Sequence, residues 1–204
     1  EDYGVKNGWG MYRVRGELPD KFEDESADTR FRFFTTNQTR YLETIDNQTN
    51  GYFSEKWSNL TDDGQTASNT VNGGVNTDYP LFRLADVYLM YSEAVVRGGT
   101  GGTLSQALDY VNRLRRRAYK SNAGDIKERQ LTKDFLIDER ARELYLEGVR
   151  RTDLIRFGLF TTSKYLWQWK GGTKNGMAVD SKYNVYPIPT SELTANPNLY
   201  NENY

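Results

Sequence analysis

The sequence of 204 residues contains no cysteine and no histidine. The absence of cysteine excludes disulfide bonds, a thiolate nucleophile, iron–sulfur clusters and cysteine-ligated zinc. The absence of histidine excludes a Ser-His-Asp triad and imidazole metal ligands. Any chemistry that the chain performs must therefore use carboxylates, lysines or tyrosines.

Long apolar runs are also missing, and the mean hydropathy is −0.80. No run approaches the roughly 18 apolar residues that a membrane-spanning helix needs. The opening residues Glu1, Asp2 and Tyr3 form neither the basic nor the apolar part of an export signal. We therefore expect either a cytosolic protein or a chain whose front end has been removed.

Charge and composition change along the chain near residue 78. Residues 1–80 carry 8 Lys or Arg and 14 Asp or Glu, whereas residues 81–160 carry 15 and 11. The first part is rich in Asn, Thr, Gly and aromatic residues, and its short apolar stretches are separated by turn-forming clusters. We predict a loop-rich segment with a few short strands over residues 1–78, and a helical region with an extended tail over residues 79–204.

Helical periodicity begins at Leu81, where apolar residues recur at the spacing of one buried helix face. Thr103 and Gln106 form the pattern of a capping box at the start of a second helix. Thr132 is a third N-cap candidate, and Gly148 is placed to end the helix that follows it. The expected helices cover residues 81–97, 104–118, 132–148 and 150–157.

The first two helices are joined by a short glycine-rich loop, so they should form an antiparallel hairpin. One such hairpin has the length of a single tetratricopeptide-type unit. Because a lone hairpin leaves an apolar face uncovered, it should pack on the third helix or on chain outside this sequence. The predicted fold class is mainly α, with tetratricopeptide-like helix hairpins, long irregular loops and a few short strands.

Residues 138–153 are the densest array of charges in the chain. A functional interpretation would make two of the carboxylates the general acid and the base or nucleophile of a glycosidase. A structural interpretation pairs each carboxylate with an arginine one helical turn away, which lowers its pKa and makes it unsuitable as a proton donor. The local pairs would be Asp138 with Arg142, Arg140 with Glu143, and Glu147 with Arg151. We favour the structural interpretation.

A basic run over residues 113–120 could meet the phosphates of a nucleic acid. The sequence pI is about 5.7 and no aromatic stacking motif adjoins the run, so we expect a solvated helix end and no nucleic-acid partner. No cofactor motif is complete either. The calcium-loop pattern that begins at Asp46 has Trp57 where a bidentate glutamate is required, and we therefore expect no cofactor and no metal.

Aromatic residues make up 14% of the chain, with 15 Tyr and 4 Trp against 9 Phe. Trp9, Tyr12 and Arg13 lie among glycines, with Asn7 beside them. Sugar rings stack on aromatic faces while their hydroxyls take polar partners, so this segment is a candidate carbohydrate site. The same aromatics could instead anchor a loop.

Three further motifs carry a family resemblance. They are FRLADVYLMYSEA at residues 82–94, DERAREL at 138–144 continuing as EGVRRTDLIRFG at 147–158, and YPIP at 186–189 followed by Glu192 and NPNL at 196–199. Taken in this order, the motifs resemble the C-terminal half of the SusD/RagB family. Residues 1–78 resemble the middle region of the family more loosely, through NGWG at 7–10 and DTRF at 28–31.

The resemblance implies a helical fold with tetratricopeptide-like pairs and no enzymatic activity. It implies a protein of the Bacteroidetes outer membrane that captures oligosaccharide or polysaccharide at the cell surface for a SusC-like TonB-dependent transporter. Family members carry a signal peptide and a lipidated cysteine at the far N-terminus. The resemblance therefore implies that this chain is a C-terminal portion whose lipid anchor lies on the absent part.

The resemblance places Trp57 near the scaffold, where we expect it to be buried, and it leaves the loop with Trp167 and Trp169 unassigned. The contact residues that we predict are Trp9, Tyr12 and Arg13, with Asn7 in support. Two other functions stay open. They are a helical protein-interaction module without its own ligand and, less favoured, a carboxylate-dependent glycosidase.

Overall fold

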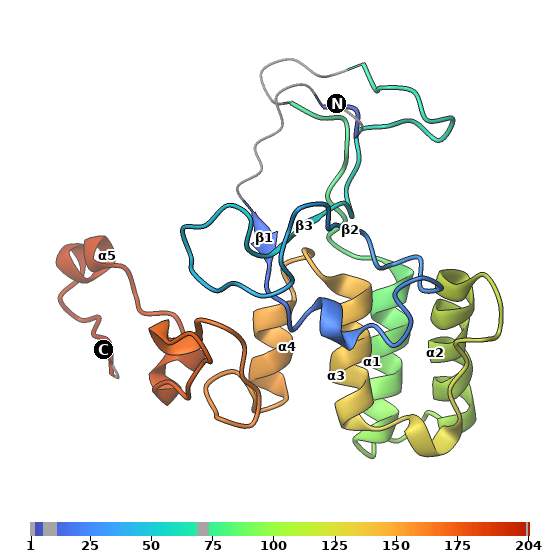
Figure 1. The fold of residues 1–204 in the computed structure, drawn as a ribbon. Coiled ribbons are helices and arrows are strands. Elements are labelled where there is room, and N and C mark those ends of the chain that lie inside the picture. Colours follow the sequence, from blue (N-terminus) through green and yellow to red (C-terminus); the bar gives the residue numbers. More distant parts are fainter. Residues whose placement is uncertain (1–2, 6–11, 69–73, 203) are drawn as a thin grey trace. The chain divides into compact units, whose positions relative to one another are not determined.

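The computed structural model describes residues 3–5, 12–68, 74–202 and 204 (Figure 1). The chain forms two compact units, Glu1–Arg150 and Arg151–Tyr204. This division differs in kind from the change of composition at residue 78, because much of the loop-rich segment packs on the helices of the first unit. The domain division at residue 78 stays a prediction.

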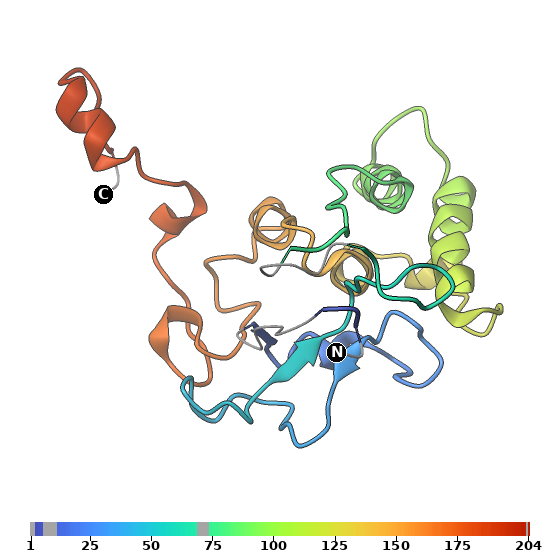
Figure 2. The same ribbon diagram turned by 90° about the horizontal axis from the view of Figure 1, so that it is seen from above.

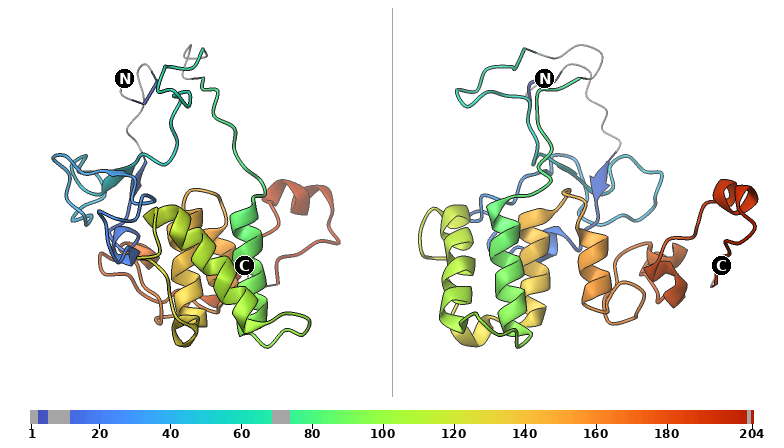
Figure 3. Two further views of the ribbon diagram at one scale, coloured as in Figure 1. Left: turned by 90° about the vertical axis from the view of Figure 1, so that its right-hand side faces the viewer. Right: turned by 180° about the vertical axis from the view of Figure 1, so that it is seen from behind.

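Helices dominate the described residues, and the predicted fold class is confirmed. The α-helices are α1 (Leu84–Val96), α2 (Leu104–Tyr119), α3 (Lys133–Leu144), α4 (Arg150–Arg156) and α5 (Thr190–Ala195). Short 3-10 helices are η1 (Pro19–Lys21), η3 (Glu128–Gln130), η4 (Lys170–Gly172) and η5 (Ser181–Asn184). In Figures 1 and 3, α1, α2 and α3 lie side by side, and Figure 2 looks along α1 and α3.

The hairpin of α1 and α2 forms as the periodicity predicts. The Thr103 side chain accepts a hydrogen bond from the Gln106 amide at 3.2 Å, which caps α2. The Gln106 side chain donates to Asp109 at 3.2 Å. Ser92 ties the two helices together, because its hydroxyl is within 2.8 Å of the Tyr88 carbonyl and 3.1 Å of the Ala107 carbonyl.

The main core lies between α1, α2 and α3. Its buried residues are Ala85, Leu89, Ala107, Val111, Leu114, Ile126, Leu131, Leu136 and Leu144. The outer face of α1 is also apolar, since Leu84, Val87 and Met90 are each about half exposed or more. We call these three residues the α1 stripe. The helix is thus apolar on two sides, and only one side is covered within the first unit.

Helix α3 begins as predicted, with the Thr132 side chain accepting from the Phe135 amide at 3.1 Å. It ends at Leu144, which is earlier than the predicted end at Gly148. Tyr145 leaves the helix with an extended backbone, and its hydroxyl donates to the Arg30 carbonyl at 2.9 Å. The side-chain packing of Tyr145 in a second core therefore overrides the continuing helical pattern.

This second core belongs to the loop-rich segment. Phe22, Phe33 and Val14 pack with Tyr145, and the rings of Phe22 and Phe33 meet edge to face with centroids 5.8 Å apart. Beside it, three short strands form an antiparallel sheet in the order β1-β3-β2. The strands are β1 (Arg13–Val14), β2 (Phe33–Phe34) and β3 (Tyr52–Ser54). The few short strands expected here are confirmed.

The second unit contains all of α4 except its first residue and continues mainly as loops, with η4, η5 and α5 set between them. The YPIP motif is extended, as its two prolines require. Across residues 3–5, 12–68, 74–202 and 204, no helix has the length and apolar character to cross a bilayer.

Candidate functional site

The structure places two of the four predicted contact residues. Asn7 and Trp9 lie outside the described residues. Tyr12 is 88% exposed. The guanidinium of Arg13 donates to the Asn47 carbonyl at 2.6 Å, which fixes it beside the sheet. The grouping of these four residues as a site stays a prediction.

Trp57, which the resemblance places near the scaffold, is half-buried and so less covered than expected. Its ring lies 6.2 Å from that of Tyr79, and the Lys56 ammonium is 5.5 Å from its centroid. These contacts make Trp57 part of the wall of a polar cleft of about 290 Å³ in the first unit. The cleft is lined mainly by charged side chains that come from α3 and from the loop-rich segment.

The charges of this cleft belong to a buried network that we call the ionic cluster. It comprises Glu139, Glu143 and Glu147 with Arg30, Lys56, Arg83, Arg115, Arg117 and Arg142. Glu139 is fully buried and contacts Arg30 at 2.7 Å, Arg115 at 3.0 Å and Arg142 at 2.7 Å. Burial alone would raise the pKa of Glu139, but the three guanidinium groups lower it to about 2.

The other two carboxylates are held in the same way. Glu143 contacts Arg83 and Arg117 at 2.6 Å each, and Glu147 contacts Lys56 at 2.5 Å and Arg83 at 2.7 Å. Burial works to raise both pKa values, and the neighbouring cations bring both below their usual range. All three groups are therefore carboxylates at neutral pH and lack the proton that a general acid must give.

The ionic cluster is structural, as predicted, but its partners differ from the predicted local pairs. Glu147 pairs with Lys56 and Arg83, while Arg151 stacks on aromatic rings in the second unit. Asp138 contacts Lys21 at 2.6 Å. Helix α3 faces inward, so most of its charges reach partners in other elements, and its internal pair, Glu139 with Arg142, is buried.

The expectation of a solvated end for the basic run is wrong for Arg115. This side chain is 1% exposed and donates to the Gly124 carbonyl as well as to Glu139. Arg116, by contrast, is half exposed and pairs with Asp125. Arg115 is therefore out of reach of a partner phosphate, whereas the side chains of Arg113, Arg116 and Arg117 are about half exposed.

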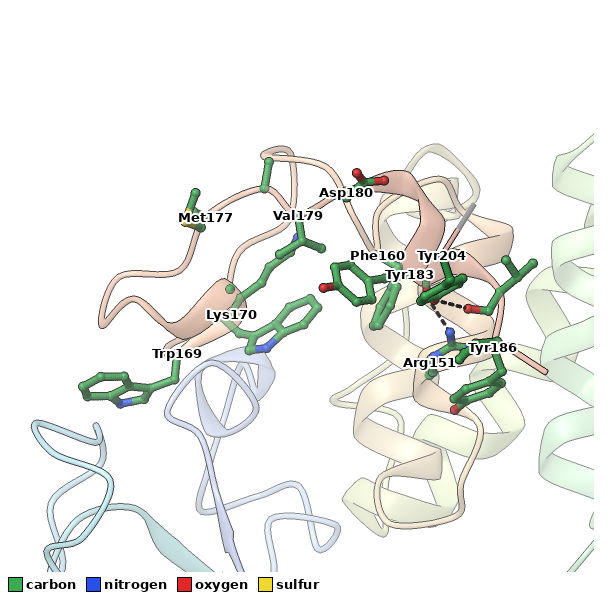
Figure 4. Close-up of a pocket in the computed structure, with 15 residues that line it drawn as sticks. Arg151, Phe160, Trp169, Lys170, Met177, Val179, Asp180, Tyr183, Tyr186 and Tyr204 are labelled. Atoms are coloured by element: carbon green, nitrogen blue, oxygen red, sulfur yellow. Dashed lines mark hydrogen bonds between the residues drawn. The ribbon is translucent and has the colours of Figure 1, made fainter. Parts of the chain in front are cut away.

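The second unit contains a larger hollow, which we call the aromatic cleft. Its volume is about 880 Å³, and all of its lining comes from residues 151–204. The aromatic lining residues are Phe160, Trp167, Trp169, Tyr183, Tyr186 and Tyr204. Figure 4 shows Arg151, Tyr183, Tyr186 and Tyr204 grouped at one end, with Trp169 and Met177 at the other.

Arg151 organises one end of the aromatic cleft. Its guanidinium carbon lies 3.9 Å from the centroid of Tyr186 and 5.0 Å from that of Phe160. The same group donates to the Tyr183 carbonyl at 2.5 Å. Tyr204 is tied to this end by its hydroxyl, which donates to the Val185 carbonyl at 2.9 Å. Stacking and hydrogen bonds together fix these rings in place.

Lys170 forms the floor between the two ends. Its side chain is 3% exposed, and its ammonium donates to the carbonyls of Thr162 at 2.6 Å and Tyr165 at 2.8 Å. The ammonium also lies 4.6 Å from the centroid of Trp167. Burial lowers the pKa of Lys170. In the part of the second unit that the structure describes, neither Lys170 nor Arg151 has a carboxylate partner.

The end of the aromatic cleft that contains Trp169 has an unusual backbone conformation. Trp169 has φ +66°, a conformation that bulky residues rarely adopt. Gly171 has the same φ, and a Cβ atom there would lie 2.6 Å from Cγ of Met177. The chain thus turns sharply between Trp169 and Met177. Strained backbone of this kind is concentrated at ligand sites and persists only where the surroundings hold it.

The sequence contains Trp167 and Trp169 in a segment with no pattern that assigns them to a site. The available signal was two tryptophans one residue apart before a Gly-Gly pair, in a segment with no helical or strand period. The tyrosines of the cleft lie at least 14 residues later along the chain. No periodic pattern links them to the tryptophans, so the cleft appears only in the folded structure.

Comparisons with known proteins agree on one family. The SusD family model matches residues 5–204. The starch-binding protein SusD of Bacteroides thetaiotaomicron is 48% identical over 157 residues, which are 76% of this chain and 26% of that protein. SusD-like protein P25 of Formosa agariphila is 36% identical over 123 residues, covering 58% of this chain and 22% of that protein. This chain thus spans about a quarter of the length of these relatives.

Two solved structures share the fold. The surface glycan-binding protein A of Bacteroides uniformis aligns with a TM-score of 0.65 over 98% of this chain and 44% of its own. A SusD-like protein of Bacteroides fragilis aligns with a TM-score of 0.64 over 97% of this chain and 48% of its own. Both are 20% identical to it, so they are evidence of a common fold alone.

Proposed function

The chain belongs to the SusD family, and from this we propose that it is part of a non-catalytic protein that binds a glycan at the cell surface. The observation that carries the proposal is the 48% identity to a protein named for starch binding. We further propose an outer-membrane location, a lipid anchor on a part of the protein that precedes this chain, and delivery of the glycan to a SusC-like TonB-dependent transporter.

The proposed contact residues are Trp9, Tyr12 and Arg13, with Asn7 in support. Two observations favour this segment. Tyr12 is 88% exposed, and the guanidinium of Arg13 uses one N–H on Asn47 and keeps others for sugar oxygens. A stacking ring beside a fixed hydrogen-bond donor is what a pyranose ring requires.

The ionic cluster argues against the glycosidase alternative. Such an enzyme needs one protonated carboxylic acid beside a second carboxylate. Glu139, Glu143 and Glu147 are all held ionised by arginine or lysine. All three carboxylates also form ion pairs within the protein, so a substrate would have to break buried ion pairs to reach them.

One observation favours the second candidate, a helical protein-interaction module. The α1 stripe of Leu84, Val87 and Met90 is an apolar helix face of the kind that packs against another helix. The two functions are compatible, because a glycan-binding protein that works with a transporter also needs a protein contact. A module without its own ligand would bind protein and ignore glycans.

Calorimetry with maltoheptaose tests the proposal, since one relative is named for starch. Trp9→Ala should weaken binding by about 1 to 3 kcal/mol, the usual contribution of one stacking platform. Tyr200→Ala is the matched control, because Tyr200 is 74% exposed and lies outside both candidate sites. The protein should release no reducing ends. Release of reducing ends, or no binding to any member of a broad glycan panel, would contradict the proposal.

A further inference from the structure

We propose that the aromatic cleft of the second unit is a second saccharide-binding site, separate from the Trp9 segment, which takes a neutral glycan chain. The inference rests on the proposed function, in that it assumes a glycan ligand for the protein. It assigns that ligand to a site that neither the sequence motifs nor the relatives indicate. All of its lining lies within residues 151–204.

The first argument is that several aromatic side chains in the cleft are exposed. Tyr186 is 77% exposed, Tyr183 47% and Tyr204 45%, although all three line the same hollow. Trp169 adds a larger, half-buried ring at the other end, and the half-buried ring of Trp167 lies next to Phe160, with centroids 5.9 Å apart. Single exposed aromatic residues are common, but several that line one hollow form a contiguous apolar surface of the kind that marks a binding site. A cleft with rings at both ends can stack more than one sugar of a chain.

The second argument is the polar groups between the rings. Lys170 has three N–H donors, of which two are used on backbone carbonyls. Arg151 has five, and it uses one on Tyr183. Asp180 also lines the cleft, and one of its carboxylate oxygens accepts from the Lys182 amide. Donors and an acceptor are therefore both available to a ligand.

This mixture selects the kind of ligand. A purely apolar ligand would cover the carboxylate of Asp180 and the unused N–H groups of Arg151 without giving them new partners. An acidic sugar would gain from Arg151 but would meet the charge of Asp180. Hydroxyl groups both donate and accept, so a neutral sugar can satisfy both kinds of group. A volume of about 880 Å³ lies within the range of small-ligand sites.

The third argument is preorganisation. Arg151 holds Tyr186 by stacking and Tyr183 by a hydrogen bond, and Tyr204 is held by its own hydroxyl. Trp169 is fixed in a left-handed backbone conformation. Rings that are already ordered lose little freedom when a ligand binds.

Trp169→Gly is the sharpest variant, because it removes the ring and relieves the left-handed backbone at once. Its melting temperature should equal or exceed that of the unaltered chain, while affinity for maltoheptaose at the cleft falls on the order of 5- to 150-fold. Tyr186→Ala removes a mostly exposed ring at the other end and should give a loss of similar size. Tyr200→Ala, outside the cleft, should bind as the unaltered chain does.

Hydrogen exchange on the whole 204-residue chain separates this inference from the proposed function. In a Trp9→Ala background, saturating maltoheptaose should still slow exchange of amides in residues 167–186, and adding Trp169→Gly should remove that protection. If Trp9→Ala abolishes all binding, or if both cleft variants fold and bind normally, the second site is refuted while glycan binding stands. If the unaltered chain binds no glycan, both proposals fail.

A charged probe tests the choice of a neutral ligand. An oligogalacturonate of matched length should protect residues 167–186 less than maltoheptaose does at equal concentration. Stronger protection by the charged chain would overturn the assignment of a neutral glycan.

Discussion

Replacing Glu139 by glutamine tests how much the ionic cluster stabilises the first unit. The side chain is fully buried, and Arg30, Arg115 and Arg142 surround it. Glutamine keeps the shape and removes the charge, so three guanidinium groups lose a shared partner inside the protein. Removing one partner of a buried ion pair typically costs about 3 to 5 kcal/mol.

The lowered pKa of Glu139 gives a second value for its contribution to stability and predicts how that contribution depends on pH. A lowering from 4.5 to about 2 corresponds to about 3 kcal/mol of unfolding free energy at neutral pH. Because the folded pKa is the lower one, this contribution is complete above pH 4.5 and is lost as the pH falls toward 2. By pH 3 about 1 kcal/mol should remain. The unaltered chain should therefore approach the variant in stability as the solution becomes acidic.

Urea unfolding at pH 7, 5 and 3 measures this difference directly. Glu128→Gln is the matched control, since Glu128 is exposed on η3, and it should change the free energy of unfolding by less than about 0.5 kcal/mol. The reasoning is refuted if Glu139→Gln costs under 1 kcal/mol at pH 7, or if its cost does not shrink between pH 7 and pH 3.

Three further predictions concern the helices of the first unit. Leu89→Ala should lower the free energy of unfolding by about 2 to 5 kcal/mol, because Leu89 is fully buried. Leu84→Ala, on the exposed side of α1, should change it by about 0.5 kcal/mol at most. Urea unfolding of the two variants measures both values. Thr132→Ala should cost about 1 kcal/mol through loss of the α3 cap, with Thr132→Ser close to neutral in the same assay. Amides of α1, α2 and α3 should exchange most slowly in hydrogen exchange, and slower exchange over residues 30–60 would contradict that order.

Periodicity and capping were sufficient to locate α1 to α4, whereas the short helix α5 lies in the tail that was expected to be extended. Thr103 and Thr132 begin α2 and α3 as expected, because an N-cap depends on residues three positions apart. The end of α3 could not be found in the same way. Tyr145 leaves the helix to pack against Phe22 and Phe33, more than 100 residues earlier in the chain. The local sequence does not show that this tertiary packing outweighs the continuing helical pattern.

The same limit applies to charge and to the candidate sites. Helix spacing offered Arg142 as the partner of Asp138, whereas the folded chain supplies Lys21. The basic run predicts a solvated helix end, whereas in the folded chain Arg115 faces Glu139. Trp167 and Trp169 could be noticed as aromatic residues, but their relation to Tyr186 requires the turns between them. Sequence therefore gives the elements and the residue types, while the partners depend on tertiary packing.

The partners of the ionic cluster lie far apart along the chain, and this has a consequence for the order of folding. Arg30 and Glu139 are separated by 109 residues, and Lys56 lies 87 residues before Glu143. The α1–α2 hairpin needs only a short loop to close, so it should form early, while these ion pairs carry a large loop-closure entropy and form late. During synthesis, Arg30 leaves the ribosome together with its neighbour Asp28, but long before its other carboxylate partners Glu139 and Glu143 exist. The early chain must therefore keep its cations hydrated, and the loop-rich segment becomes ordered only when α3 has been made.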